Sequence, residues 1–296
     1  MWRRCPMENG TSKMRINEKQ VKSILTKSSV HHGYTASPYS GCAHDCMYCY
    51  ARYLPDWTGH EGERWGDYID VKYWESLNEK QKSRLSGVDI MISSATDPYQ
   101  DIELKYGRTH QLLTELVGSG ADILIVTKSG NVVRDANLIK ELGATVALSV
   151  NTLDEEFRAD MDQGSTIGTR LAAMETLHKN GVLTTCFISP VFPGITDAPA
   201  IIERVTGICD EVYLEHLVLQ NPYKGSVLYY IKTKYPDLYP YYDRLFNKGE
   251  LEEWWKWDDF MEEWCKENGY EYSYEHFSKE HRDKPVVTNF RGHKGK

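Results

Sequence analysis

Three cysteines lie close together in the first fifth of the chain. Cys42, Cys46 and Cys49 have the spacing Cys-x3-Cys-x2-Cys within GCAHDCMYCYAR (41–52). The chain of 296 residues has seven cysteines, an odd number, and the other four are far apart in the sequence. A disulfide framework is not expected in so long a chain, so the three clustered thiols are predicted to be metal ligands or redox groups.

Two kinds of metal centre use thiolates at such short spacing. A zinc site would add His44 as a fourth ligand, but zinc sites normally close with a second ligand pair about a dozen or more residues downstream. The sequence offers no such pair. Three thiolates on one loop suit a [4Fe-4S] cluster, in which each iron takes one thiolate and one iron is left without a protein ligand. The spacing favours the cluster, and zinc is the alternative.

The segments that must position this loop alternate between strand and helix patterns. Six short runs are rich in apolar or β-branched residues, as buried parallel strands are: YTASPY (34–39), VDIMISSA (88–95), ADILIVT (121–127), ATVALSV (144–150), VLTTCFIS (182–189) and DEVYLEHLVL (210–219). Helical patterns separate them; in TRLAAMETLHKNG, Leu171, Met174 and Leu177 share one face and Gly181 is the predicted stop. The alternation predicts a parallel sheet with right-handed crossovers, the first of them in residues 66–87.

Each predicted strand is followed by a polar segment rich in turn-forming residues. The cysteine loop follows the first run, TDPYQDIE the second and KSGN the third. Ligands of parallel barrels and open α/β sheets bind at the carboxyl ends of the strands, so these segments are expected to meet at one site. Beyond residue 222 the sequence becomes dense in Tyr and Trp with Pro-marked breaks, which predicts a helical extension.

Composition limits the partners of the protein. No apolar run approaches the roughly 20 residues of a membrane span, and the first residues lack the apolar middle of a secretory signal. A cytoplasmic protein without a membrane partner is therefore expected. The net charge of -8 argues against an extended DNA-binding face, because such binding depends on Lys and Arg that neutralise phosphates.

The cysteine loop resembles that of a known enzyme superfamily. CAHDCMYC is similar to the Cys-x3-Cys-x-aromatic-Cys signature of radical S-adenosylmethionine (radical SAM) enzymes, and SPYSGCAHDCMYCYAR resembles the branch related to spore photoproduct lyase. The similarity covers roughly residues 34–220 and includes SSATDPYQDIE, VTKSG, LSVNTLDEEFR and ISPVFPGITD in the same order. We expect an α/β fold, a partial (β/α)6 TIM-type barrel of parallel strands (34–221), with an N-terminal extension (1–33) and an aromatic-rich, helical C-terminal extension (222–296) that acts as a lid.

The resemblance implies both cofactors and a reaction. In this superfamily a [4Fe-4S] cluster binds the amino and carboxylate groups of S-adenosylmethionine at its open iron. An electron from a reductant such as flavodoxin or ferredoxin cleaves the cofactor to methionine and a 5'-deoxyadenosyl radical, which takes a hydrogen atom from the substrate. A nucleobase, nucleotide or other small molecule is the expected substrate. The alternative is a non-catalytic iron-sulfur or zinc protein that uses the same loop.

The resemblance also assigns roles to individual residues. Tyr48 would lie near the adenine, with packing of the loop as its alternative role. Thr96 and Asp97 would receive the cofactor's amino group, although an Asp-Pro turn in which Asp97 caps its own backbone explains the carboxylate equally well. Lys128 would face the cofactor's carboxylate as a point charge, and a solvated strand end is the alternative.

Three further residues complete the predicted cofactor site. Ser149 and Asn151 suit the ribose hydroxyls, and Arg170 is expected to be a carboxylate partner. The sequence departs from the branch in two places. MDQGSTIG (161–168) replaces the usual Glu-Pro-Gly-Ala-Pro-Ser type of segment, and Ser94 stands where spore photoproduct lyase has the cysteine that returns hydrogen to the product radical. Repair of thymine dimers in spore DNA is therefore not predicted.

Two groups outside the loop have a structural and a functional interpretation. Cys186 on the fifth predicted strand is either core filling or a hydrogen donor inside the barrel. Trp254, Trp255, Trp257 and Trp264 either pack on the barrel or stack on a substrate ring.

Overall fold

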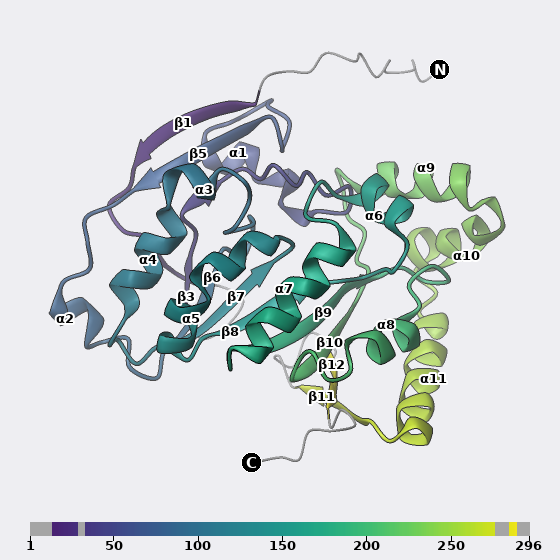
Figure 1. The fold of residues 1–296 in the computed structure, drawn as a ribbon. Helices are drawn as coiled ribbons and strands as arrows, with labels where there is room; N and C mark the ends of the chain where they lie inside the picture. Colours follow the sequence, from purple (N-terminus) through teal and green to yellow (C-terminus); the bar gives the residue numbers. More distant parts are fainter. Residues whose placement is uncertain (1–13, 29–32, 276–283, 289–296) are drawn as a thin grey trace.

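The computed structural model describes residues 14–28, 33–275 and 284–288. A sheet of nine strands runs through the molecule in the order β11-β12-β10-β9-β8-β7-β6-β3-β2 (Figure 1). Its six central strands are mutually parallel: β3 (Tyr34–Ala36), β6 (Asp89–Ile92), β7 (Asp122–Thr127), β8 (Thr145–Ser149), β9 (Leu183–Val191) and β10 (Glu211–His216). All six predicted strands are confirmed, as is the partial (β/α)6 barrel.

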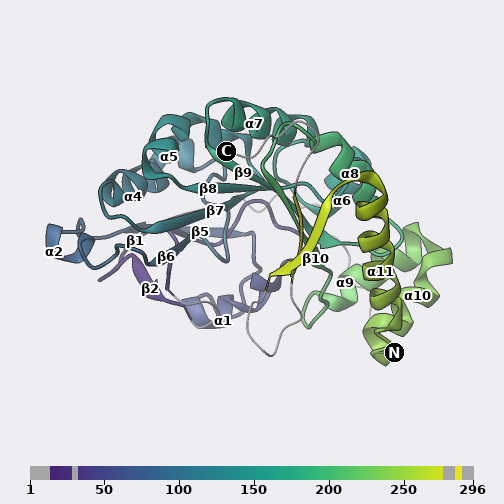
Figure 2. The same cartoon turned by 90° about the horizontal axis from the view of Figure 1, so that it is seen from below.

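Helices connect the parallel strands and cover one face of the sheet. The connecting elements are α3 (Glu103–Tyr106), α4 (Arg108–Leu116), η2 (Gly130–Asp135), α5 (Ala136–Leu142), α6 (Glu155–Met161), α7 (Ile167–Lys179) and α8 (Ala198–Val205). Figure 2 shows the sheet curved, with α4, α5, α7 and α8 along its convex side. In α7 the predicted apolar face of Leu171, Met174 and Leu177 is buried, and the chain leaves the helix at Gly181 with φ 76°.

The two faces of the sheet differ in burial. Residues that point toward the convex side, such as Ile125, Leu148, Ile188 and Leu214, are fully buried in the main core. Their neighbours along each strand point toward the concave side, because side chains alternate in a strand. Many of these are only half-buried, which leaves the inner face of the barrel partly open.

The N-terminal part adds a second, small sheet that the sequence did not reveal. Strand β1 (Arg15–Gln20) pairs in parallel with β5 (Tyr68–Tyr73), which pairs in antiparallel fashion with β4 (Tyr39–Ser40). The expected first crossover in residues 66–87 thus contains a strand and only one short helix, α2 (Glu79–Lys82). The remaining elements are β2 (Leu25–Lys27), η1 (Tyr50–Tyr53) and α1 (Pro55–Thr58).

The C-terminal extension is helical only in part. It contains α9 (Lys224–Lys234), η3 (Pro236–Leu238), α10 (Tyr239–Asp243), η4 (Arg244–Lys248) and α11 (Glu252–Asn268). The chain then forms β11 (Glu271–Glu275) and β12 (Lys284–Thr288), and β12 pairs in antiparallel fashion with β10 at the edge of the barrel. The expectation of a purely helical extension is corrected here, because the edge of β10 is covered by a hairpin.

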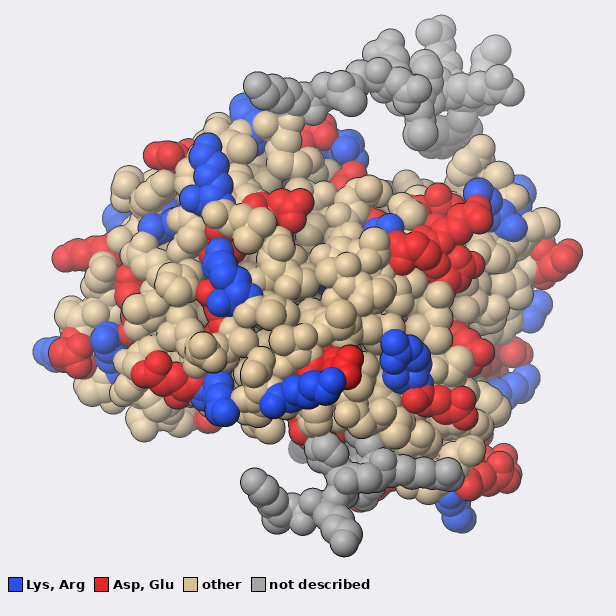
Figure 3. Space-filling view, viewed as in Figure 1, with Lys and Arg blue, Asp and Glu red and all other residues tan. Residues whose placement is uncertain are grey.

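Two global expectations concern membranes and charge. Among the described residues, no helix has the length and apolar character needed to cross a membrane. On the face shown in Figure 3, basic side chains are scattered among acidic ones and form no continuous stripe.

Candidate active site

The cysteine loop lies between β4 and η1, against the segments that follow the parallel strands. Cys42 and Cys46 are buried and Cys49 is half-buried. Backbone and side-chain hydrogen bonds fix the loop on two sides. On one side the Gln100 amide accepts from the Ala43 N–H at 2.9 Å and donates to the Gly41 carbonyl at 3.3 Å.

The other side of the loop is bound to the end of α6 and to the residues that follow it. The Met47 N–H donates to the Met161 carbonyl, and the Gln163 N–H donates to the His44 carbonyl, each at 2.8 Å. The loop therefore has a fixed backbone path between two neighbouring elements of the barrel.

Burial keeps the three thiols protonated in the metal-free protein. It raises the pKa of Cys42 to about 12, with a further contribution from the negative charge of Asp97. Burial also raises the pKa of Cys46 and of Cys49, and the positive charge of Lys128 opposes the rise at both. Metal binding must therefore displace protons, and Lys128 favours the thiolate forms.

The three thiols do not form a site for a single ion. No group of three or more His, Cys, Asp and Glu side chains within the described part of the chain is arranged to hold one metal. A [4Fe-4S] cluster requires a different arrangement, since each of its thiolates binds a different iron. The donor set of three neighbouring thiols on one loop fits that cluster.

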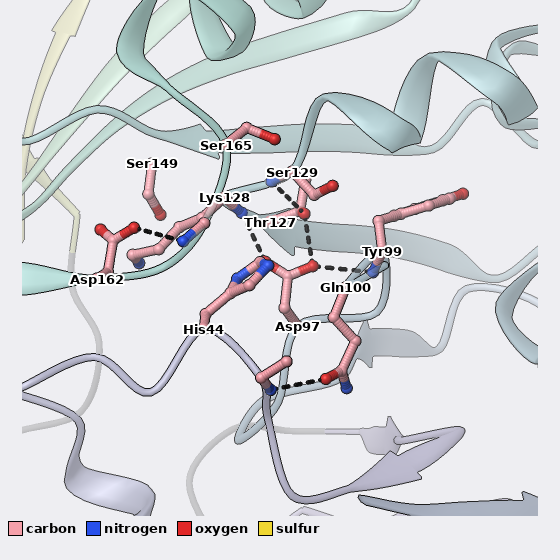
Figure 4. A network of polar contacts seen from close by, with 12 residues as sticks. His44, Asp97, Tyr99, Gln100, Thr127, Lys128, Ser129, Ser149, Asp162 and Ser165 are labelled. Carbon is pink, nitrogen blue, oxygen red and sulfur yellow. Dashed lines mark hydrogen bonds and ion pairs between the residues drawn. The ribbon is translucent and has the colours of Figure 1, made fainter. Parts of the chain in front are cut away.

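Asp97 is the centre of a buried polar network next to the loop (Figure 4). Its carboxylate accepts hydrogen bonds from the Tyr99 N–H at 2.8 Å, the Thr127 hydroxyl at 2.7 Å and the Lys128 N–H at 2.7 Å. His44 Nδ1 lies 3.2 Å from its second oxygen. Burial alone would raise the pKa of Asp97, but the His44 charge and these hydrogen bonds lower it to about 2.

These contacts bear on the predicted role of Asp97. The hydrogen bond from the Tyr99 N–H forms the Asp-Pro turn, which is the alternative to a cofactor contact. Both carboxylate oxygens of Asp97 accept hydrogen bonds from other groups of the protein. The network joins the cysteine loop, through His44, to the end of β7, where Lys128 begins the next segment. A contact between Asp97 and the cofactor's amino group stays a prediction.

Lys128 and Tyr48 lie together beside the thiols. The Lys128 ammonium is 5.8 Å from the centroid of the Tyr48 ring. The same ring packs edge-on against Phe192, with 5.5 Å between centroids. Lys128 is half-buried and faces the loop, so it is not a solvated strand end. Its predicted contact with the cofactor's carboxylate is consistent with this position.

Several buried polar atoms around the loop lack a hydrogen-bond partner among the described residues. They include the hydroxyls of Tyr48, Thr96 and Ser149 and the second carboxylate oxygen of Asp162. Buried polar groups are nearly always paired in native proteins, so an unpaired set at one place points to a missing ligand. Three of these four residues were predicted to contact the cofactor, and the donors and acceptors suit its amino, carboxylate and ribose groups.

Arg170 has a partner that the sequence did not predict. Its guanidinium is fully buried and donates to Asp162 Oδ1, to the Ser165 carbonyl at 2.7 Å and to the Ser149 carbonyl at 3.1 Å. The carboxylate that Arg170 pairs with is thus Asp162, and the guanidinium fixes the backbone around Ser149. Asn151 is also engaged, since its amide donates to the Pro190 carbonyl at 3.2 Å.

Sequence reasoning missed three residues of the site: His44, Gln100 and Asp162. His44 was weighed only as a zinc ligand, and the polar spacing of TDPYQDIE contained Gln100 without marking it. The pairing of Asp162 with Arg170 depends on how α6 and α7 pack, which neither helix encodes alone.

The two functional interpretations outside the loop are not supported. Cys186 is fully buried in the main core, with Ile188 on the same face of β9, so it does not point into the barrel. Trp254 stacks on His216 at 4.0 Å, and Trp264 stacks on Tyr270 at 5.5 Å. These two tryptophans of α11 therefore pack against the protein, and a lid role of the C-terminal extension stays a prediction.

Comparisons with known proteins agree with this geometry. An uncharacterised protein of Methanocaldococcus jannaschii is 29% identical over 77% of this chain and 86% of its own. A radical SAM Nα-GlyT isomerase of Pseudomonas phage M6 is 28% identical over 58% of this chain and 36% of its own. The structure of spore photoproduct lyase with bound AdoMet and dinucleoside spore photoproduct matches this protein with a TM-score of 0.52 at 14% sequence identity. The match covers 94% of this chain and 75% of that chain, and it shows that the two have a similar fold. Residues 36–204 match the radical SAM superfamily, and the chain belongs to that family.

Proposed function

We propose that this protein is a radical SAM enzyme that removes a hydrogen atom from a nucleobase- or nucleotide-type substrate. The observation that carries the proposal is the set of three neighbouring thiols on one loop, two of them buried, surrounded by unpaired buried polar atoms at the carboxyl edge of six parallel strands. The family supplies the two cofactors, a [4Fe-4S] cluster and S-adenosylmethionine.

Residues of the described site have distinct tasks in this proposal. Cys42, Cys46 and Cys49 hold the cluster. Lys128 offers a positive charge to the carboxylate of S-adenosylmethionine, and the Ser149 hydroxyl accepts a hydrogen bond from its ribose. When bound, cluster and cofactor supply the one-electron chemistry that breaks a C–H bond of the substrate. The chain's own contribution is to orient the two reactants and to exclude water and other hydrogen donors.

Two findings support the choice of substrate class. The structure of spore photoproduct lyase, which has the same fold, holds a bound dinucleoside spore photoproduct, and the phage relative is named a radical SAM Nα-GlyT isomerase. The net charge of -8 favours a small or single-site substrate over a long duplex. Ser94 stands where spore photoproduct lyase has its hydrogen-donating cysteine. An O–H bond is stronger than an S–H bond, so Ser94 cannot take that role, and repair of the spore photoproduct is not proposed.

Transfer of deuterium tests this proposal. The anaerobically reconstituted protein would be incubated with dithionite, S-adenosylmethionine and deoxynucleosides deuterated on carbon. We expect 5'-deoxyadenosine that carries one deuterium from one of the nucleosides, measured by mass spectrometry. Cofactor cleavage without deuterium transfer from any nucleoside would contradict the substrate class, and no cleavage at all would favour the non-catalytic alternative.

A further inference from the structure

The last two parallel strands of the barrel carry an irregularity at their carboxyl ends. Leu214 of β10 lies opposite Ile188 of β9, but His216 lies opposite Val191, so β9 has an additional residue here. Such a bulge re-aims side chains, and bulges are common beside active sites. It occurs on the edge of the barrel where the other described site residues gather.

Ser189 and Glu215 face each other across this irregularity. The Ser189 hydroxyl donates a hydrogen bond to Glu215 Oε2 at 2.6 Å. Val212 and Leu214, on the other face of β10, are fully buried in the main core. By alternation, Glu215 points to the concave, inner face of the barrel. The pair therefore places a carboxylate on the inner face, at the end where the cysteine loop lies.

Five further residues of the inner face are apolar or aromatic. Met91, Leu124, Val126, Phe187 and Tyr213 occupy alternate positions on four of the strands and are only half-buried. None of them belongs to the buried core clusters of the described residues. A concave surface with apolar walls and a few polar groups is the usual form of a small-molecule site.

Tyr50 places an aromatic ring next to the cysteine loop. It follows Cys49, its ring is 46% exposed, and its hydroxyl donates to the Ser94 carbonyl. Because Ser94 follows β6, the Tyr50 ring lies at the carboxyl edge of the parallel strands, as Ser189 and Glu215 do.

The charges on the inner face have opposite signs at two places. Lys128, whose ammonium lies 5.8 Å from the centroid of the Tyr48 ring in the cysteine loop, suits the carboxylate of S-adenosylmethionine. Glu215 repels that carboxylate and attracts N–H donors instead. A planar ring that stacks on Tyr50 and turns an amino group toward Glu215 matches the aromatic surface and the negative charge at this place.

We propose that Ser189 and Glu215 form the substrate-recognition part of the site and select a nucleobase that carries an exocyclic amino group. This inference rests on the proposed function and specifies its substrate class. Glu215 accepts from the amino group, Ser189 fixes the carboxylate, and Tyr50 offers the ring surface. Bases without an amino group present a carbonyl oxygen at that position, which the carboxylate repels.

Matched pairs of nucleosides test the inference by binding alone. The probes are 2'-deoxycytidine against 2'-deoxyuridine and 2'-deoxyadenosine against 2'-deoxyinosine, titrated into the anaerobic holoprotein with S-adenosylmethionine and followed by ligand-observed NMR. In at least one pair the amino member is expected to bind about tenfold or more tightly, the usual worth of a hydrogen bond to a charged group. Glu215→Gln is expected to abolish that preference, and Ser189→Ala to reduce it.

Glu211→Gln is the matched control, because it removes the same charge from the same face at the opposite end of β10. It is expected to leave the preference unchanged. Equal binding of both members of each pair by the wild-type protein, a preference that survives Glu215→Gln, or no nucleoside binding would overturn the inference. Reductive cleavage of S-adenosylmethionine by the same samples is measured separately, so a failure of recognition is distinguished from a failure of the radical SAM proposal.

Discussion

Replacement of Asp97 by Asn removes the charge at the centre of the network beneath the cysteine loop. The pKa of Asp97 is about 2, against an ordinary value of 3.8. That difference corresponds to about 2 kcal/mol of unfolding free energy at neutral pH, since one pKa unit equals about 1.4 kcal/mol. In addition, the new amide nitrogen would point at a hydrogen-bond donor such as the Lys128 N–H, because both oxygens of Asp97 accept from donors. A buried N–H without an acceptor costs about 1–3 kcal/mol. We expect a loss of at least about 2 kcal/mol.

Urea unfolding of the metal-free protein at pH 7 measures this loss, with Asp259→Asn on the exposed side of α11 as the control. The control is expected to change the unfolding free energy by less than about 0.5 kcal/mol. The contribution of Asp97 is fully present above its unfolded-state pKa near 3.8 and is lost as the pH falls toward about 2, so the difference between wild type and variant is expected to shrink below about pH 4. A variant as stable as the control, or a difference that does not become smaller below about pH 4, would refute the reasoning.

Three further variants test the cofactor site. Simultaneous replacement of Cys42, Cys46 and Cys49 by Ala is expected to abolish iron binding and cofactor cleavage while circular dichroism still reports the folded barrel, because the thiols lie on a loop. Lys128→Ala is expected to weaken S-adenosylmethionine binding by about one to two decades without loss of iron, measured by anaerobic calorimetry, and an unchanged dissociation constant would remove Lys128 from the cofactor site. Arg170→Ala removes the nearest basic partner of the buried Asp162 carboxylate, leaves Arg158 at 3.9 Å, and is expected to cost about 3–5 kcal/mol in urea unfolding; a loss under about 1 kcal/mol would contradict the buried ion pair.

The parallel barrel could be predicted because its strands are buried on the convex face and separated by helical patterns. Runs such as ADILIVT have enough β-branched and apolar residues to identify a strand without any knowledge of its neighbours. The small sheet was missed because β5, YIDVKY, alternates with polar residues and lies inside a segment that was assigned to a crossover. Strand β1, RINEKQ, is almost entirely exposed and has no hydrophobic pattern to find.

The cysteine ligands could be predicted from spacing, whereas the supporting contacts could not. A metal loop keeps its ligands within a few residues, so sequence distance reports their proximity. The contacts of His44 with Asp97, of Asp162 with Arg170 and of Ser189 with Glu215 join different elements. Such pairs depend on packing and on strand register, neither of which a single sequence displays.

The most direct test of the account is anaerobic reconstitution followed by reduction with dithionite in the presence of S-adenosylmethionine. We predict about four irons per chain, as a [4Fe-4S] cluster requires, a visible absorption that bleaches on reduction, and formation of 5'-deoxyadenosine and methionine. A colourless protein with one bound zinc, or a reduced cluster that leaves S-adenosylmethionine intact, would contradict the account.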